Sequence, residues 1–228
     1  MKNKEQEIID MILEMKKLGY PDEKIVEDFE TKLLKLHNLK LSQFFPVNIK
    51  GADVKAHGQV IIDSEDLEEN YEFATHVKGA DVKAHGMVIA NSGNLLYNYK
   101  FARDAKGADT WAHEQVILDS KNLEYNYIFA RDVKKANVRA HGKVIIDSGD
   151  LEYNYKFASD VKGADVRAHG KVIINGGSIE YNEKFKLIEG SDIDAHVTAI
   201  NNTKIQKYKE SLNECLDSMI KEKVKVKK

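Results

Sequence analysis

The residues with the clearest chemical potential are histidines that recur at a fixed spacing. Imidazole nitrogens bind zinc and transfer protons near neutral pH, so metal binding and acid–base chemistry are the first hypotheses. The alternative is a buried structural role, because each histidine lies in the middle of an apolar helical face. The series runs in steps of 28 residues with a last step of 27: His57, His85, His113, His141, His169 and His196.

The expected spacing of the helices favours the structural role for these histidines. Equivalent helices in a stack lie roughly 8–10 Å apart from axis to axis. Zinc holds each imidazole nitrogen at about 2 Å, so successive histidines cannot readily share a metal. No second metal ligand recurs beside each histidine. The sequence therefore predicts a buried histidine ladder, and no metal site, cofactor or catalytic residue.

Asparagines form a second series in the same register. At 100° per residue they fall at the centre of an apolar helical face. An unpaired buried amide costs about 1–3 kcal/mol, so we expect each asparagine to bond a histidine ring or a turn carbonyl and to fix the register between hairpins. Buried neutral histidines beside them also predict sensitivity to acid below about pH 6. The asparagines are Asn70, Asn98, Asn126, Asn154 and Asn182.

A repeated pair of helices is needed to position both ladders. The triplet Gly-Ala-Asp begins at Gly51, Gly79, Gly107 and Gly163, with variants at Lys135 and Gly190. Its third residue is an Asp or Asn helix cap, and a second Asp, Asn or Ser cap recurs midway through each repeat. Glycines follow the expected helix ends. Each unit is thus two short antiparallel helices, which must stack on neighbours to bury their apolar faces.

The predicted fold is all-α: an α-solenoid of five antiparallel helical hairpins between non-repeating N-terminal and C-terminal helical caps. Residues 1–50 form the N-terminal cap with a decayed repeat. The hairpins follow at 51–78, 79–106, 107–134, 135–162 and 163–189, with a half repeat at 190–201. Residues 202–228 form a C-terminal capping helix and a lysine-rich tail.

The N-terminal cap is expected to contain two helices before the decayed repeat. One covers residues 3–18, and the second is capped by Asp22 and runs to about Leu36. Pro46 is expected to break the decayed second-helix pattern, since proline lacks the backbone donor.

The C-terminal end is expected to contain two separate helices. The first runs from Asp192 to Ile200 and the second from about Thr203 to Lys223. The second carries an apolar stripe, composed of Ile205, Tyr208, Leu212, Cys215 and Met219.

Composition excludes several classes of function. The formal net charge is −2, with 35 basic and 37 acidic residues, so no nucleic-acid or membrane partner is demanded. Cys215 is the single cysteine, which excludes an intramolecular disulfide and favours a reducing, cytoplasmic location. The N-terminus lacks the apolar core of a signal peptide, and no apolar run approaches a membrane span. No Walker loop, nucleophile elbow or His-Glu-x-x-His motif occurs, so an enzyme is not expected.

The candidate partner-binding residues are apolar side chains at positions where the other repeats are polar. Trp111 replaces Lys or Arg, and Met87 replaces Gln or Lys. Leu96 stands where other repeats have Glu, and Ile128 stands where they have Glu or Lys. Exposed Trp and Met are typical anchors of protein interfaces. The alternative is that they are scattered exposed residues with no role in binding.

Binding of a nucleic-acid backbone is the second function hypothesis. Basic residues gather along one predicted edge of the stack, as in solenoids that track phosphates. Each lysine at a helix end also has a structural reason, because it complements the helix dipole. The edge comprises Lys50, Lys55, Lys78, Lys83, Lys106, Lys134, Arg139, Lys162 and Arg167.

The repeat motif suggests a family resemblance. The segments Val-Lys-Gly-Ala-Asp-Val-Lys-Ala-His-Gly (Val77 to Gly86) and Leu-Glu-Tyr-Asn-Tyr-Lys-Phe-Ala (Leu151 to Ala158) resemble short helical-hairpin repeats of uncharacterised proteins from low-GC bacteria and their mobile elements. The resemblance covers about 150 residues and implies a solenoid similar in kind to HEAT or tetratricopeptide arrays. It implies no activity. The function we expect is a non-enzymatic protein-interaction scaffold or inhibitor, of the kind that a phage or another mobile element encodes.

Overall fold

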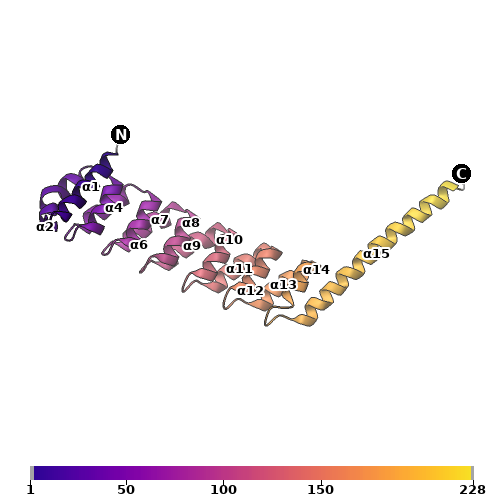
Figure 1. Cartoon of the computed structure of the whole chain (residues 1–228). Helices are drawn as coiled ribbons and strands as arrows, with labels where there is room; N and C mark the ends of the chain where they lie inside the picture. Colours follow the sequence, from indigo (N-terminus) through magenta and orange to yellow (C-terminus); the bar gives the residue numbers. More distant parts are fainter. Residues whose placement is uncertain (1–2, 227–228) are drawn as a thin grey trace. The chain divides into compact units, whose positions relative to one another are not determined.

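The computed structural model describes residues 3–226, with side chains through Ser218. This part of the chain is helical without strands, and helices that are adjacent in the sequence pack against one another in pairs (Figure 1). No helix in it has the length and apolar character needed to cross a bilayer. The contacts divide the chain into two units: unit 1 comprises residues 1–120 and 133–136, and unit 2 comprises residues 121–132 and 137–228.

The N-terminal part of unit 1 packs around its own apolar core. Ile9, Ile12, Ile25, Leu33 and Phe45 are buried in this cluster. Its helices are α1 (Lys4–Lys17), α2 (Asp22–Ile25), the π-helical turn η1 (Val26–Glu30), α3 (Thr31–Leu34) and α4 (Leu39–Asn48).

Two expectations for this region were wrong. Pro21, and not Asp22, is the N-cap of α2. The Asp22 carboxylate instead accepts the backbone N–H of Lys50 at 2.8 Å and pairs with Lys16 at 3.1 Å. Pro46 does not break α4, which continues to Asn48. The proline removes only one backbone donor, and the fully buried Phe45 beside it holds the helix in place.

The repeated helices begin directly after the predicted caps, and all of them except α15 end near the predicted turns. In unit 1 they are α5 (Val54–Asp63), α6 (Leu67–His76), α7 (Val82–Ser92), α8 (Leu95–Asp104) and α9 (Thr110–Ser120). In unit 2 they are α10 (Leu123–Asp132), α11 (Val138–Ser148), α12 (Leu151–Asp160), α13 (Val166–Asn175), α14 (Ile179–Phe185) and α15 (Ile193–Val226).

The expected caps are present at the helix starts. Asp53 accepts the backbone N–H of Ala56 at 2.9 Å, and Asp66 accepts that of Glu69 at 3.0 Å. Equivalent bonds recur at the later repeats, which satisfies one of the orphan amides of each helix.

The turns between helices require a positive φ, and residues other than glycine supply it in places. Gly149 after α11 has φ 70°, and Glu65 and Lys121 adopt a similar φ at the equivalent turns. In the other turn, Lys135 has φ 69° where Gly163 has φ 88°. A side chain in this left-handed region is strained, so Glu65, Lys121 and Lys135 each raise the free energy of the native state.

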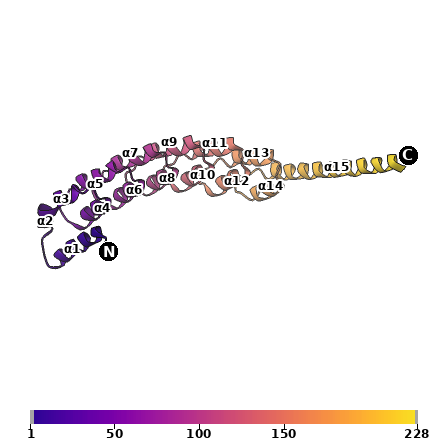
Figure 2. The ribbon, with the colours of Figure 1, turned by 90° about the horizontal axis from the view of Figure 1, so that it is seen from above.

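Two rows of helices form each unit. Figure 2 shows α5, α7 and α9 on one side of unit 1, with α6 and α8 on the other, and unit 2 has the same alternation. The most extensive contacts join a second helix to the first helix of the next repeat, as in α6 with α7 and α12 with α13. Each repeat contributes one fully buried isoleucine and one fully buried phenylalanine, such as Ile145 and Phe157.

The C-terminal helix corrects the sequence expectation. Residues 193–226 form one continuous helix, α15, because the segment contains neither Gly nor Pro to end it. Its beginning packs on α13 and α14, and the Thr203 hydroxyl donates to the Gly177 carbonyl at 3.1 Å. From Lys204 to Ser218 every side chain is exposed, Cys215 included. The apolar stripe that was expected to pack on the repeats (Ile205, Tyr208, Leu212 and Cys215) therefore packs on none of the described ones. Its fifth member, Met219, lies outside the described side chains.

Candidate functional site

The histidine and asparagine ladders are one hydrogen-bonded system. All six histidines and all five asparagines are buried, with at most 1% of each exposed. The Asn Oδ1 atom lies 2.7–2.8 Å from the His Nδ1 atom of the following first helix. The bonded pairs are Asn70–His85, Asn98–His113, Asn126–His141, Asn154–His169 and Asn182–His196.

Four of the asparagines each connect three consecutive helices: Asn70, Asn98, Asn154 and Asn182. The Asn70 amide nitrogen donates to the Ile61 carbonyl of α5 at 3.0 Å and to the Asp66 carbonyl at the start of α6 at 2.7 Å. Its carbonyl oxygen faces His85 on α7. Ile61 is in the last turn of α5, where carbonyls lack helical partners, so the side chain also caps that helix.

This arrangement determines the tautomer of the histidine. Both N–H groups of the Asn70 amide are used, so its Oδ1 atom acts as the acceptor and His85 Nδ1 carries the proton. The Nε2 atoms of His85, His169 and His196 then keep a lone pair that has no hydrogen-bond partner within the described part of the chain. Protonation of such a nitrogen would place an imidazolium cation in an apolar site, where it is poorly solvated, so the ring stays neutral more readily.

Burial lowers the pKa of His57, His85, His113, His141 and His169 to about 4, and it also lowers the pKa of His196. The rings are therefore neutral at pH 7 and unsuited to proton transfer near that pH. Within the described residues, no group of three His, Cys, Asp or Glu side chains is arranged to hold a metal ion.

A glycine in the middle of the first helix is the part of this system that the sequence reasoning missed. A Cβ atom on Gly142 would lie 3.2 Å from Phe157 Cε1 and 3.4 Å from His169 Nε2. The Phe157 and His169 rings stack with centroids 4.9 Å apart. The same Gly–Phe–His contact recurs at Gly58, Gly86 and Gly170. Glycine in a helix interior costs roughly 1 kcal/mol, so its recurrence directly after His57, His85, His141 and His169 was the available signal.

The first ladder position departs from the others. Ser42 stands where later repeats have Asn, and neither ring nitrogen of His57 has a hydrogen-bond partner in the described part. Its Nε2 atom lies 3.4 Å from Glu30 Oε1, and that carboxylate accepts the Asp53 backbone N–H at 2.7 Å. Glu30 occupies the register position of Gly58, and its burial raises its pKa. The buried Glu114 occupies the same register position in the third repeat.

Three of the four candidate anchors are exposed. Trp111 is 67% exposed on α9, Met87 is 56% exposed on α7, and Leu96 is 42% exposed on α8. Ile128 is instead half-buried and packs against the cluster around Tyr127 and Ala130, so it was wrongly assigned to an exposed row. The reason is that α10 faces α12, whose side chains cover it.

Shallow grooves run between successive first helices. Met87 lines two of them: one with Ile62 and Leu67 toward α5, and one with Lys83 and Asp109 toward α9. Trp111 is on α9, which follows α7 in the same row of helices and contacts it (Figure 2). An exposed methionine between two grooves, with an exposed tryptophan on the next helix, provides an apolar surface among charges.

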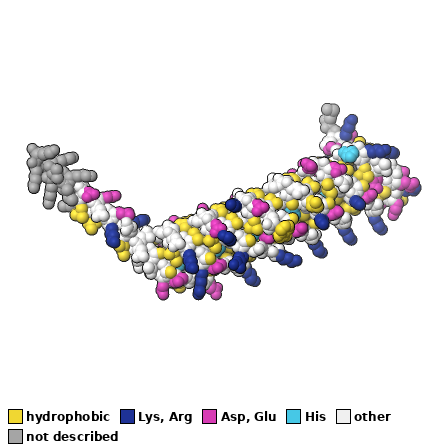
Figure 3. All heavy atoms as spheres, turned by 180° about the vertical axis from the view of Figure 1, so that it is seen from behind, with side chains coloured by type: hydrophobic (Ala, Val, Ile, Leu, Met, Phe, Trp, Pro, Cys, Tyr) yellow, Lys and Arg dark blue, Asp and Glu magenta, His cyan; other side chains and the backbone are white. Residues whose placement is uncertain are grey.

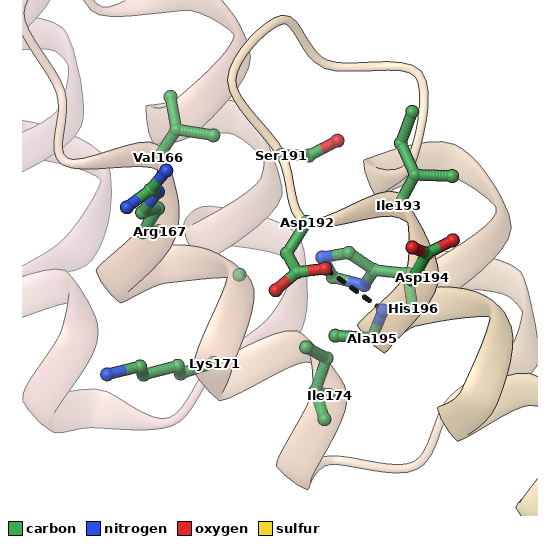
Figure 4. Close-up of a pocket in the computed structure, with 11 residues that line it drawn as sticks. Val166, Arg167, Lys171, Ile174, Ser191, Asp192, Ile193, Asp194, Ala195 and His196 are labelled. Atoms are coloured by element: carbon green, nitrogen blue, oxygen red, sulfur yellow. Dashed lines mark hydrogen bonds between the residues drawn. The ribbon is translucent and has the colours of Figure 1, made fainter.

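The corresponding groove in unit 2 lies between α13 and the start of α15 (Figure 4). Gly170 and His196 line it, while Arg167 and Lys171 stand on one side and Asp194 on the other. The groove therefore carries charges of both signs, which favour no ligand of one sign.

All nine residues of the basic edge are exposed. Within each unit, Figure 3 shows Lys and Arg side chains projecting from the face in view, with acidic side chains among them. The edge is therefore accessible to phosphates, but its positive charge is interrupted.

A network of tyrosines on the second helices was absent from the sequence predictions. Tyr71 packs edge-on against Tyr97 with ring centroids 6.3 Å apart, and Lys100 lies over both rings. The Tyr71 hydroxyl donates to Asp104 at 2.8 Å, and Arg103 also binds that carboxylate. Related pairs occur in unit 2 at Tyr127–Tyr153 and Tyr155–Tyr181. These contacts join successive second helices, so they explain the repeated tyrosines as packing residues.

Comparisons with known proteins return no relative. No protein-family model matches the chain, and neither a curated protein nor a solved structure matches it.

Proposed function

We propose that the chain is an α-solenoid of five helical hairpins with non-repeating caps, and that it binds another protein without catalysing a reaction. The repeated cap, His, Asn and Phe positions support the solenoid, since each repeat makes the same contacts with its neighbour inside its unit. The chemistry of the ladder supports a structural and not a catalytic role, because its groups are buried, neutral and bonded to one another.

The binding surface in this proposal is the row of first helices in unit 1. The observation that carries it is Trp111, which is 67% exposed on a row where sibling repeats have Lys or Arg. Met87 extends this surface between two grooves. Aromatic and methionine anchors surrounded by polar residues are the usual centre of a protein interface, and an acidic or basic rim gives it specificity.

The test uses variants that restore the residue found in sibling repeats, so that the fold is preserved. Trp111→Lys copies Lys83, and Met87→Gln copies Gln59 and Gln115. The immobilised chain would be exposed to lysate of its native host, and captured proteins identified by mass spectrometry. A specific partner should bind the wild type and the control Arg139→Ala, and bind the double variant at least tenfold more weakly.

Capture of the same proteins by the double variant would contradict the proposed surface. The second candidate function, binding of a nucleic-acid backbone, is supported by the exposure of all nine basic-edge residues. It predicts capture that is abolished by nuclease and that weakens steeply with salt. Loss of binding in Lys78→Ala and Lys106→Ala, with no effect of Trp111→Lys, would favour it over the protein interface.

A further inference from the structure

The end of α13 differs from the ends of the first helices in the other repeats. Each earlier repeat has a serine at this end, whose hydroxyl donates to the backbone carbonyl three residues back at 2.6–2.7 Å. The fifth repeat has Gly176 at the same position, so α13 lacks a bond that its counterparts have. Its last turn therefore opens at a lower free-energy cost. The serines are Ser64, Ser92, Ser120 and Ser148.

Gly176 directly follows Asn175, which is the last residue of α13 and is exposed to solvent. The sequence contains no other Asn-Gly pair. The backbone nitrogen after an asparagine closes a five-membered ring when it attacks the side-chain carboxamide carbon. A Cβ on the following residue hinders this attack, whereas glycine has none and leaves helical geometry at little steric cost. Asn175 is therefore placed to react with the backbone next to it.

We propose that Asn175 is a site of spontaneous deamidation. The Gly176 nitrogen forms a bond to Asn175 Cγ and gives up its proton, while the Cγ–Nδ2 bond breaks and ammonia leaves with that proton. Water then adds to one of the two carbonyl carbons of the succinimide ring and opens it, which yields aspartate or isoaspartate. The sequence of steps involves no oxidation or reduction, and it adds one negative charge to the chain.

The hydrogen bonds of the helix end control the rate of this reaction. The Gly176 N–H donates to the Val172 carbonyl at 2.9 Å, so this bond must open before the nitrogen can attack. Opening of one terminal turn is among the least costly motions of a folded protein. We therefore expect the reaction in the native state, and a faster reaction when the chain is unfolded.

The aspartate product fits the fold of the repeat. Three earlier repeats already have aspartate at the position of Asn175: Asp63, Asp119 and Asp147. Lys143 pairs with Asp147 at 2.6 Å, and Lys171 stands four residues before Asn175 in the same way. An aspartate at 175 gains the same ion pair. Isoaspartate instead lengthens the main chain by one carbon, two residues before the Gly177 carbonyl that accepts the Thr203 hydroxyl.

The first experiment follows the reaction in the folded full chain at mildly alkaline pH. Peptide mass spectrometry should show a gain of about 1 Da at Asn175, and fragmentation should identify both aspartate and isoaspartate. Asn91 is the internal control, because it is exposed at the same position of its repeat and is followed by Ser92. Asn175 should react about tenfold faster than Asn91 or more, since Ser92 has a Cβ and is bonded to Ile89.

The second experiment exchanges the following residues. Gly176→Ser copies the earlier repeats and should bring the rate at Asn175 down to that of Asn91. Its Cβ would lie 2.5 Å from Leu151 Cδ2, so circular dichroism must show that this variant folds. Ser92→Gly avoids that contact, and it should raise the rate at Asn91 to that of Asn175.

Three results would overturn the proposal. The first is an unmodified Asn175 in folded protein after a time in which the urea-unfolded chain deamidates there completely. The second is an equal rate at Asn175 and Asn91 in the wild type. The third is a rate at Asn91 that Ser92→Gly leaves unchanged. The reaction needs no other protein, so none of these results depends on the surface proposed around Trp111.

Discussion

His85 Nδ1 lies 2.8 Å from Asn70 Oδ1, and this one contact joins the second helix of a repeat to the first helix of the next. Because the Asn70 amide also holds the end of α5, a single side chain connects three consecutive helices. The same relationship recurs at Asn154 and His169 in unit 2. It makes the ladder a device for fixing the register of the hairpins, and it leads to the following predictions.

Replacing Asn154 by Leu should destabilise the protein strongly. The change leaves the His169 Nδ1–H donor without its acceptor, and the Ile145 carbonyl keeps only the Ser148 hydroxyl at 2.6 Å. At about 1–3 kcal/mol for the buried donor left unsatisfied and about 1 kcal/mol for the lost carbonyl bond, the loss should be about 2–4 kcal/mol. Urea unfolding followed by circular dichroism would measure it. In a double-mutant cycle with His169→Phe the two losses should be less than additive, and full additivity would show that the bond contributes nothing.

Acid should unfold the protein well above pH 4. The pKa of each ladder histidine except His196 falls from the ordinary 6.5 to about 4 on folding, so the unfolded chain binds more protons between these values. The stabilisation is complete above about pH 6.5 and is lost as the pH falls toward 4. The urea midpoint should therefore drop steeply from pH 7 to pH 5. His141→Gln, which removes one of these groups, should make that dependence shallower, and an unchanged slope would contradict this prediction.

The protonated nitrogen of the ladder histidines can be read directly. Nitrogen NMR of the folded protein should show His85, His113, His141, His169 and His196 with a proton on Nδ1 and none on Nε2. Replacing Asn154 by Asp in the folded protein should preserve this assignment at His169, since the carboxylate still accepts. Observation of an Nε2 proton at His85 would mean that the amide of Asn70 is oriented the other way.

Alanine at Gly142 should destabilise, although alanine is the better helix former. The added Cβ would lie 3.2 Å from the Phe157 ring and 3.4 Å from His169 Nε2, and both rings are fully buried. We expect a net loss of about 1–2 kcal/mol in thermal or urea unfolding. In a Phe157→Leu background, which removes the closest ring atom, the same change should cost less or become favourable by up to about 1 kcal/mol. Equal cost in both backgrounds would exclude the ring contact as the cause.

Glycine at Lys135 should stabilise the protein. Lys135 has φ 69°, in the left-handed region that costs a residue with a side chain about 1–2 kcal/mol. Lys135→Gly should therefore raise the free energy of unfolding by about 1 kcal/mol after the entropy cost of glycine. The matched change Gly163→Lys, at the equivalent turn, should lower it by a similar amount. A neutral effect at both positions would indicate that the turns relax without strain.

Much of the repeated part could be predicted because its signals are local. The caps at Asp53 and Asp66 act within three residues, and polar side chains such as Asn70 at the centre of an apolar face must find a partner. The role of Gly142 could not be found in this way, since it depends on two rings from α12 and α13. The same holds for the pairing of Tyr71 with Tyr97, which joins positions in different repeats.

The candidate surface was less predictable than the fold. Trp111, Met87 and Leu96 were assigned to solvent from periodicity and are exposed, whereas Ile128 is covered by neighbours that the helical projection of one helix does not include. The continuity of α15 was also missed. The segment from Ile193 to Val226 contains neither Gly nor Pro, so no strong stop signal interrupts the helix.

The ladder also bears on how the length of this protein can change. Each His–Asn bond needs only the residues of two neighbouring repeats, fifteen positions apart in four of the five cases and fourteen in the last. A gene rearrangement that adds or removes 28 codons returns each bonded histidine to an asparagine, while a change that turns the histidine off the buried face leaves a buried donor and acceptor unmatched. A repeat shorter by one residue is accommodated at the last position, where His196 still bonds Asn182 at 2.7 Å. Near-identical repeats in DNA promote rearrangements that add or remove a whole repeat. The ladder therefore favours length changes by whole repeats and disfavours changes by part of a repeat.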